Sequence, residues 1–482
     1  MLIFLLYHKP IILKVWSWRK MAFNIGIGNA VIASQTSDGI PYMWSSGDVS
    51  TPPTFVGVLT GFQPWTNDSN SYYMSDRFGW DVDIGNGTIV VGAPFRAEDN
   101  YTSGGIGTFR PGGVYVFDID GNPVGLASRV HSYALDNSRY QLGYRVAVGS
   151  GKIAATSIKV FTSGNDASGT YPAVPGEQRM WYLDGTGGTS VQFGNSQSGD
   201  IDHPADIDIA FGKLVIGDTY DDTSDLSAGG HVFTDYQIGG EVHVKGIISS
   251  QYNSSYVHHN PNTIFGIAVG GGTTLGKTYS GILTPVLVAG SELGYQVAAH
   301  AGMYFATSKL SSSSDTRYLR IMNYDGYNIN SYEGHSSHTS GFDKVEAGCG
   351  RVIWGGQREF RIYGINSIFA KEIDIYSLYG KYIIDMAIGS GRIGISISSS
   401  TGWGYQEEVL IYDLDGNLID TISRPSDAGG RWFGKSLAIK HGRIVIGAPD
   451  DDTFSKISGK AYLYKTPEVI NFYDLVDMHG KF

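Results

Sequence analysis

One hairpin pattern returns along the chain, and this internal repeat constrains the fold more than any other feature. Its clearest copies are residues 78–94 (FGWDVDIGNGTIVVGAP) and 433–449 (FGKSLAIKHGRIVIGAP). Each reads as an alternating strand, a two-residue turn that contains glycine, and a second strand that is almost wholly apolar. Asn86-Gly87 lies between two such strands and predicts a type I′ turn, because both central residues of that turn need positive φ.

Weaker copies and further strands extend this unit. After several copies a third strand ends in an Asp-Gly turn, as at 114–122 and 409–417, and a fourth short strand follows. Four antiparallel strands in roughly 40–60 residues are typical of a propeller blade. We therefore expect an all-β fold, a β-propeller of about seven four-stranded blades, with eight as the alternative. Eight blades remain the alternative because the sequence has eight copies of the hairpin pattern in total. The six weaker copies are at residues 25–34, 142–153, 207–217, 293–302, 350–355 and 389–395.

Composition agrees with strands joined by tight turns. The 482 residues include 66 glycines and 31 tyrosines, and only 17% are charged, below the usual quarter. The formal net charge of -11 repels phosphate backbones, so we expect no nucleic-acid partner. The single cysteine, Cys349, excludes an internal disulfide framework and a cysteine-based zinc site, and we interpret it as a small turn or core residue.

The chain divides into three segments. We expect one repeat domain over residues 21–466, because no proline-rich or charged linker interrupts it, although residues from about 240 to 295 fit the repeat worst. Residues 1–20 are apolar but too short and too interrupted for a membrane span, so we interpret them as a non-structural leader or an over-extended start before Met21. The tail, residues 467–482, carries apolar residues that we expect to close the ring or to dock on a partner. We expect no membrane partner.

At its two clearest copies the sequence resembles the FG-GAP repeats of integrin α-chain propellers and of many bacterial and viral surface proteins. The Phe-Gly of the first strand and the Gly-Ala-Pro after the second are literal at 78–94 and 433–449, and elsewhere only the glycine and apolar skeleton remains. The short Gly-Asn-Gly or Gly-Ser-Gly turn looks like the variant found in structural proteins of marine bacteriophages. The resemblance implies a propeller and points to a virion component.

The acidic loops are the candidate ligand-binding residues. Calcium-binding FG-GAP repeats place Asp and Asn between the first two strands, where they cage a hard cation. Here that loop is 85–87, 149–151 or 440–442, without a carboxylate, so this calcium function is not carried over. Acidic clusters lie instead after the second strand, in rim loops that could hold Ca²⁺, although solvated turns explain them as well. They are Asp99, Asp221, Asp222, Asp450, Asp451 and Asp452. We expect no other cofactor.

Other polar and aromatic features have plain structural interpretations. The Asp-x-Asp-Gly-Asn runs at 118–122 and 413–417 imitate a calcium loop but lack its further ligands, and a hairpin turn explains them. His258 and His259 are adjacent, so on a strand they point to opposite faces and cannot easily share a metal. Four tryptophans in polar loops either stack on sugar rings or pack against a neighbouring blade: Trp44, Trp65, Trp403 and Trp432.

Three functions fit this sequence. We find no Gly-x-Ser-x-Gly elbow, phosphate loop or HExxH motif, and we expect no enzyme. The leading hypothesis is a virion protein of a tail, fibre or capsid decoration that binds other virion proteins or a host-surface receptor or glycan. The second is a secreted or cell-surface adhesion or lectin-like propeller of a bacterium. The third is a glycoside hydrolase, which needs a carboxylate pair facing the central channel, roughly 5–10 Å apart.

Overall fold

The computed structural model describes a large part of the 482-residue chain. The described residues are 4–6, 9–11, 42–45, 48, 50–61, 76–96, 112–127, 138–149, 151–161, 176–183, 190–193, 204–210, 213–218, 241–246, 266–270, 296–309, 317–323, 328–334, 344–365, 369–399, 407–426, 432–451 and 459–471.

Within those ranges the fold is all-β, and seven antiparallel sheets have four strands each. We number the sheets 1 to 7 and call the first-listed strand of each its inner strand. Sheet 1 is β5 (Val82–Gly85), β6 (Thr88–Gly92), β7 (Val114–Asp118) and β8 (Pro123–Ala127), and sheet 2 is β9 (Ser138–Gly149), β10 (Lys152–Phe161), β11 (Gly176–Leu183) and β12 (Ser190–Phe193). Sheet 3 is β13 (Pro204–Ala210), β14 (Lys213–Asp218), β15 (Glu241–Gly246) and β16 (Gly266–Gly270), and sheet 4 is β17 (Val297–His300), β18 (Met303–Lys309), β19 (Arg317–Asn323) and β20 (Asn328–Gly334). Sheet 5 is β21 (Lys344–Gly348), β22 (Arg351–Gly355), β23 (Glu359–Gly364) and β24 (Phe369–Asp374), and sheet 6 is β25 (Tyr382–Gly389), β26 (Arg392–Ser398), β27 (Glu408–Asp413) and β28 (Leu418–Ser423). Sheet 7 is β29 (Ser436–Lys440), β30 (Arg443–Ala448), β31 (Lys460–Lys465) and β4 (Thr54–Leu59).

The expected hairpins are confirmed. The seven sequence copies from residue 78 onward coincide with the first hairpin of one sheet each, whereas the copy at 25–34 lies outside the described residues. Asn86 and Gly87 have φ of 50° and 76°, and His441 and Gly442 have 52° and 67°, as a type I′ turn requires. Cys349 is the first residue of such a turn, with φ of 53°, and it is buried.

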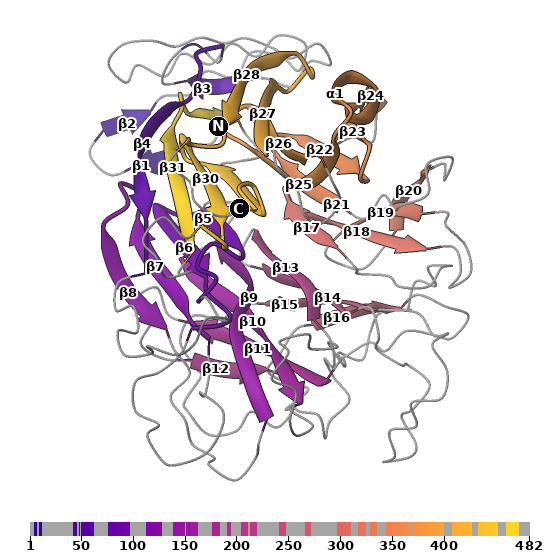
Figure 1. The fold of residues 1–482 in the computed structure, drawn as a ribbon. Coiled ribbons are helices and arrows are strands. Elements are labelled where there is room, and N and C mark those ends of the chain that lie inside the picture. Colours follow the sequence, from indigo (N-terminus) through magenta and orange to yellow (C-terminus); the bar gives the residue numbers. More distant parts are fainter. Residues whose placement is uncertain are drawn as a thin grey trace.

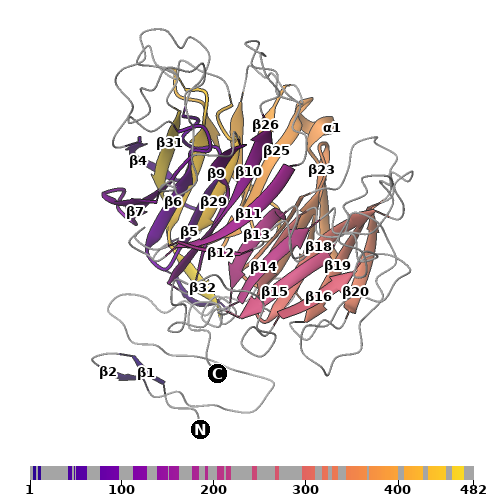
Figure 2. The same ribbon diagram turned by 90° about the horizontal axis from the view of Figure 1, so that it is seen from below.

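The sheets follow one another in chain order around a common centre (Figure 1). Each inner strand contacts the next, from β5 through β9, β13, β17, β21 and β25 to β29, and β29 contacts β5 in turn. In Figure 1 the yellow strands of sheet 7 accordingly lie beside the indigo and purple strands at the start of the chain. Sheet 7 is completed by an N-terminal strand, since Lys465 on β31 pairs with Thr54 on β4. Two short pairs lie outside the sheets: β1 (Phe4–Leu6) with β2 (Lys9–Ile11), set apart in Figure 2, and β3 (Tyr42–Ser45) with β32 (Val469–Asn471).

The literal FG and GAP residues meet where sheet 7 contacts sheet 1. The Phe78 backbone forms a parallel bridge with Gly459, which directly precedes β31 of sheet 7, and the Ser436 hydroxyl donates to the Gly79 carbonyl at 3.0 Å. A Cβ on Gly447 would lie 2.2 Å from that same carbonyl oxygen, so only glycine permits the approach. The next interface repeats this geometry, because a Cβ on Gly92 would lie 2.1 Å from the Gly143 carbonyl oxygen.

The apolar core lies between neighbouring sheets. Sheets 1 and 7 bury Ile84 and Val91 against Val445 and Leu463, all at most 1% exposed. Because the second strand of a sheet packs on both faces, Ile89, Val90 and Val91 are all fully buried, which explains their unbroken apolar run. Burying one aliphatic side chain of this kind stabilises a fold by about 1.5–3 kcal/mol.

The helix content is small. The short helix α1 (Ile375–Tyr379) follows β24, with Asp374 accepting from the Ser377 amide at 2.8 Å as its N-cap. Among the described residues, no helix is both long enough and apolar enough to cross a bilayer.

Candidate functional site

Charged residues occupy the inner strands where these face the common centre. Side chains alternate along a strand, so the residues five, three and one positions before each turn share that face. At the first level these residues are Asp81, Arg145, Asp206, Gln296, Lys344, Asp385 and Ser436. At the second level they are Asp83, Ala147, Asp208, Ala298, Glu346, Ala387 and Ala438, and at the third Gly85, Gly149, Ala210, His300, Gly348, Gly389 and Lys440.

Most of these carboxylates bond the backbone of the neighbouring sheet. Asp81 and Asp83 of sheet 1 accept the amides of Val146 and Val148 on β9, each at 2.7 Å. The same pattern joins sheets 3 and 4, where Asp206 and Asp208 accept from Val297 at 2.9 Å and Ala299 at 2.7 Å, and sheets 6 and 7, where Asp385 accepts from Leu437 at 2.8 Å. The two carboxylates of the Asp-x-Asp pattern on an inner strand therefore join that strand to the next sheet by hydrogen bonds.

Cations lie between the carboxylates. The Arg145 guanidinium is 4.0 Å from Asp81 Oδ1 and 3.6 Å from Asp206 Oδ1, so one side chain on β9 bridges sheets 1 and 3. Lys344 Nζ lies 3.2 Å from Asp385 Oδ1, and Lys440 Nζ lies 3.3 Å from Asp83 Oδ1 across the interface of sheets 7 and 1. Burial opposes the charge of Lys440, but Asp83, Asp208 and Glu346 outweigh it and raise its pKa.

The carboxyls of the inner strands that face the common centre, which we call the axial carboxyls, bind protons differently from surface carboxyls. Burial raises the pKa of Asp81 to about 7 and of Asp206 to about 6, in each case partly offset by Arg145. Burial, followed by repulsion from Asp208, Asp385 and Asp206, raises the pKa of Glu346 well above its ordinary value. Within the described part of the chain, no hydrogen bond or ion pair holds the Glu346 carboxyl. Asp81 and Asp206 therefore release their protons closer to neutral pH than surface carboxyls do.

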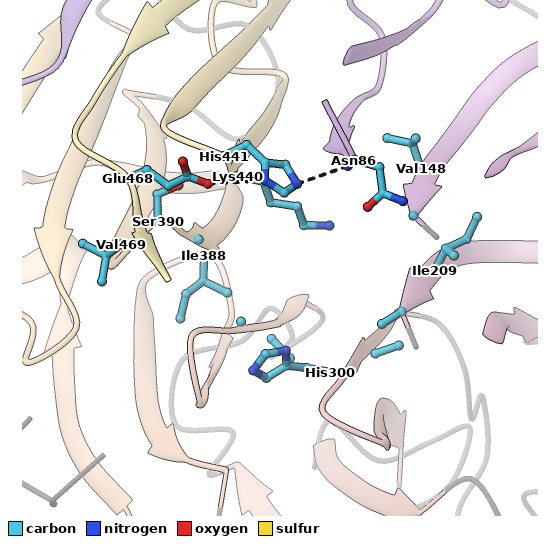
Figure 3. A pocket seen from close by; sticks show the side chains of 17 residues that line it. Asn86, Val148, Ile209, His300, Ile388, Ser390, Lys440, His441, Glu468 and Val469 are labelled. Atoms are coloured by element: carbon cyan, nitrogen blue, oxygen red, sulfur yellow. Dashed lines mark hydrogen bonds and ion pairs between the residues drawn. The ribbon is translucent and has the colours of Figure 1, made fainter. Parts of the chain in front are cut away.

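A cavity of about 90 Å³ opens at the third level, where the inner strands end in their turns (Figure 3). All seven inner strands contribute to its wall, and the C-terminal segment adds Glu468 and Val469. Lys440 points into this space between Asn86 and His300. The volume has room for several water molecules.

Aromatic and cationic side chains gather at the opposite end of the inner strands, beside the FG residues. The Trp80 and Trp432 ring centroids are 5.8 Å apart, and Lys435 Nζ lies 5.1 Å from both. Arg77 lies over Trp80 and Phe95, at 5.1 and 4.6 Å. Burial lowers the pKa of Lys435 to about 8, and Arg145 and Lys344 add to this effect.

A buried carboxylate holds this aromatic cluster in place. Trp432 has φ of 75°, an uncommon conformation for a bulky residue. The two oxygens of Glu407 accept its amide at 2.6 Å and the Phe433 amide at 2.7 Å. Glu407 is only 4% exposed, and burial raises its pKa. Of the two predicted environments for Trp432, the structure has the inter-sheet one, since its ring stacks on sheet 1. Side chains of the other three tryptophans lie outside the described set.

Two of the predicted rim-loop residues are described. Asp450 lies 3.8 Å from Arg77 Nε, beside the aromatic cluster. Asp451 is 2% exposed and holds internal partners: Lys460 Nζ lies 3.2 Å from its carboxylate, and the Tyr462 hydroxyl donates to it. Asp99, Asp221, Asp222 and Asp452 lie outside the described residues, as do His258 and His259. Calcium binding by these loops stays a prediction.

The Asp-Gly runs form hairpin turns, as predicted. Asp118 accepts the amides of Asp120 at 3.0 Å and Asn122 at 2.8 Å, between β7 and β8. Asp413 repeats these bonds with Asp415 and Asn417 between β27 and β28. In the described parts of the chain, no three His, Cys, Asp or Glu side chains lie close enough to hold a metal ion.

The axial charges are the functional candidates that the sequence reasoning missed. Their signal was present: Asp81, Asp83, Asp206 and Asp208 interrupt otherwise apolar strands at alternate positions. Charge at alternate positions of a strand indicates one polar face, and in a strand enclosed by neighbours that face needs buried partners.

Comparison with known proteins agrees with the motif geometry. The FG-GAP repeat family matches residues 72–117 and 424–464, and Gly79 of the first segment contacts Gly447 of the second between sheets 1 and 7. The chain carries FG-GAP repeats at these two places. Such repeats fit a binding or structural role. No curated protein matches the chain.

Solved structures similar to this chain are distant from it in sequence. One is a quinonprotein alcohol dehydrogenase-like protein from Bacteroides thetaiotaomicron, with 10% identity, a TM-score of 0.39, and coverage of 73% of this chain and 67% of that one. Another is Hsv2 from Kluyvelomyces marxianus, with 9% identity, a TM-score of 0.39, and coverage of 81% and 98%.

Proposed function

We propose that this chain is a seven-bladed β-propeller that acts as a rigid, non-catalytic binding platform. The observation that carries the proposal is the seam between sheets 7 and 1. There Gly447 and Gly79 make the same close approach as Gly92 and Gly143 make between sheets 1 and 2. The same contact between sheets 1 and 2 and between sheets 7 and 1 favours a complete ring. β4 comes before sheet 1 in the chain and pairs with β31 of sheet 7, so it joins the two ends of that ring.

The axial carboxylates support the non-catalytic part of the proposal. Asp81, Asp206 and Asp385 each accept a backbone amide of the next sheet through Oδ2. Their Oδ1 atoms lie against Arg145 or Lys344. Groups committed in this way order the ring, since removing one leaves a buried amide without its acceptor. The aromatic cluster around Trp432 and the rim residue Asp450 share one face, which is the surface we assign to binding.

A hydrolase is the second candidate, because the axis brings carboxyls of different proton affinity together. Acid and base catalysis uses such a difference. Incubation of the purified chain with a panel of polysaccharides, alongside Asp81→Asn and Glu346→Gln variants, tests it. Hydrolysis that both variants abolish without unfolding would establish the hydrolase and overturn the non-catalytic platform.

The virion role is the finer form of the proposal, and the phage-like repeat pattern motivates it. Mass spectrometry of purified virus particles from the source environment tests it. Stoichiometric recovery of this chain's peptides from particles supports a structural virion protein whose partners are other virion proteins or a host-surface receptor or glycan. Recovery from host envelope or secreted fractions instead would overturn the virion role and favour the bacterial adhesion protein.

A further inference from the structure

Polar side chains at the cavity end link four successive sheet interfaces. His300 Nε2 accepts the Gly350 amide at 2.9 Å between sheets 4 and 5, and Cys349 Sγ accepts the Gly391 amide at 3.3 Å between sheets 5 and 6. Ser390 Oγ accepts the Gly442 amide at 2.8 Å between sheets 6 and 7. His441 Nε2 then accepts the Asn86 amide at 3.1 Å across the seam between sheets 7 and 1 (Figure 3).

Two of these four acceptors are imidazoles, and their role depends on proton binding. A ring nitrogen accepts a hydrogen bond only while it carries no proton, and both nitrogens are donors in the imidazolium. The hydroxyl of Ser390 keeps its acceptor lone pairs over the whole physiological range. Acid therefore affects the interface of sheets 4 and 5 and the seam, while the Ser390 link is unchanged.

Charged groups around the two histidines determine the response. His441 Nδ1 lies 3.4 Å from Glu468 Oε1 on the C-terminal segment, and Lys440 of the same turn points into the cavity. His300 lines that cavity too and is only 2% exposed. At the next level, Asp83 pairs with Lys440, and Asp208 and Glu346 raise the pKa of that lysine.

We propose that His300 and His441 form an acid-sensitive latch that holds adjacent sheets together when neutral and releases them when protonated. On protonation, each Nε2–H faces a backbone N–H, so an attraction becomes a repulsion of two donors. Glu468 attracts the charged His441 ring, which keeps it at the C-terminal segment while its bond to Asn86 is lost. At His300, a charge on a nearly buried side chain costs free energy that opening to water relieves.

The latch adds a regulation that the binding platform does not require. The seam matters most because it joins the first and last sheets, so its loosening changes the geometry of the ring.

Hydrogen–deuterium exchange tests the latch on the full chain. Peptides covering residues 82–92 and 344–355 report the Asn86 and Gly350 amides, with rates corrected for the intrinsic effect of pH. We expect protection to fall about fivefold between pH 7.5 and 5.5 in the wild type, the loss of one net hydrogen bond. The double variant His300→Gln and His441→Gln keeps acceptors that do not titrate, so its protection should stay constant.

A matched control and an independent readout complete the test. Ser390→Ala should lower protection at Gly442 by a similar factor at every pH. Equal acid-induced loss in the double glutamine variant and the wild type would overturn the latch. NMR titration of the wild-type imidazoles serves if a variant fails to fold: protonation of His300 and His441 with unchanged protection of Asn86 and Gly350 would also overturn it. Neither result bears on whether the platform binds a partner.

Discussion

The carbonyl oxygen of Gly79 lies 2.2 Å from the point where a Cβ of Gly447 would stand, although 368 positions separate the two residues (447 − 79). This close approach brings the start of the repeat array against its end. It also gives a physical meaning to the literal FG-GAP motif: the glycine of one copy leaves the space that the glycine carbonyl of another copy occupies.

Gly447→Ala should therefore destabilise the protein by about 3 kcal/mol, because the added methyl group forces the two sheets apart. Chemical denaturation measures this loss. Gly57→Ala is the matched control, since nothing lies within 4 Å of its added Cβ, and its stability should change by less than about 0.5 kcal/mol. Equal effects of the two substitutions would refute the close-packed seam.

Arg145→Met should lower the free energy of unfolding by about 2 kcal/mol at pH 8, because it leaves Asp81 and Asp206 without their shared cation. Arg145 lowers the pKa of both carboxyls, so its loss raises them further. At pH 5 both carboxyls then hold protons, and the loss of stability should be smaller. A deficit that does not change between pH 8 and pH 5 would contradict this electrostatic role.

Glu346→Gln should stabilise the protein at pH 8 and have little effect at pH 4. The pKa of Glu346 is raised in the folded state, so between the two values the folded chain holds a proton that the unfolded chain has lost. Stability consequently falls as pH rises above the ordinary glutamate pKa, and the amide removes that loss. We expect a gain of about 1 kcal/mol or more at pH 8 by denaturant titration.

Glu372→Gln is the control for this prediction. Glu372 lies on the outer strand β24, its carboxylate pairs with Arg361 on β23, and its side chain is 43% exposed, so stability should change little at either pH. A destabilised Glu346→Gln protein at pH 8 would show that the axis needs the ionised carboxylate.

Glu407→Ala should cost about 2 kcal/mol, because two amides of the aromatic cluster lose a charged acceptor. Release of Trp432 from its positive φ should also change tryptophan fluorescence. The adjacent Glu408 forms an ion pair with Lys381 and its side chain is 30% exposed, so Glu408→Ala should cost under about 1 kcal/mol and leave the fluorescence unchanged. Similar fluorescence spectra for the Glu407→Ala and Glu408→Ala variants would contradict the role of Glu407 in holding Trp432.

Local chemistry made much of the fold predictable. Asn86-Gly87 and the other turn pairs need positive φ, which only a few residue types accept readily, so the hairpins could be read from the residues. The Asp118 and Asp413 turns follow from bonds between residues four positions apart or fewer. The rim-loop acids were less informative, because the internal pairing of Asp451 with Lys460 and Tyr462 depends on how two strands of sheet 7 bring them together.

By itself, the sequence determined the all-β class, the repeated hairpin and its turn geometry, since these depend on period-two alternation and on residues close together in the chain. Only the tertiary structure decided which copies meet. It placed Asp83 against Lys440 and His441 against Asn86, residues more than 350 positions apart. Periodicity assigns a side chain to one face of its own strand. The partner across that face depends on how the sheets pack around the centre. The hydrogen bonds of the axial carboxylates and the seam between sheets 7 and 1 therefore arise only from the tertiary structure.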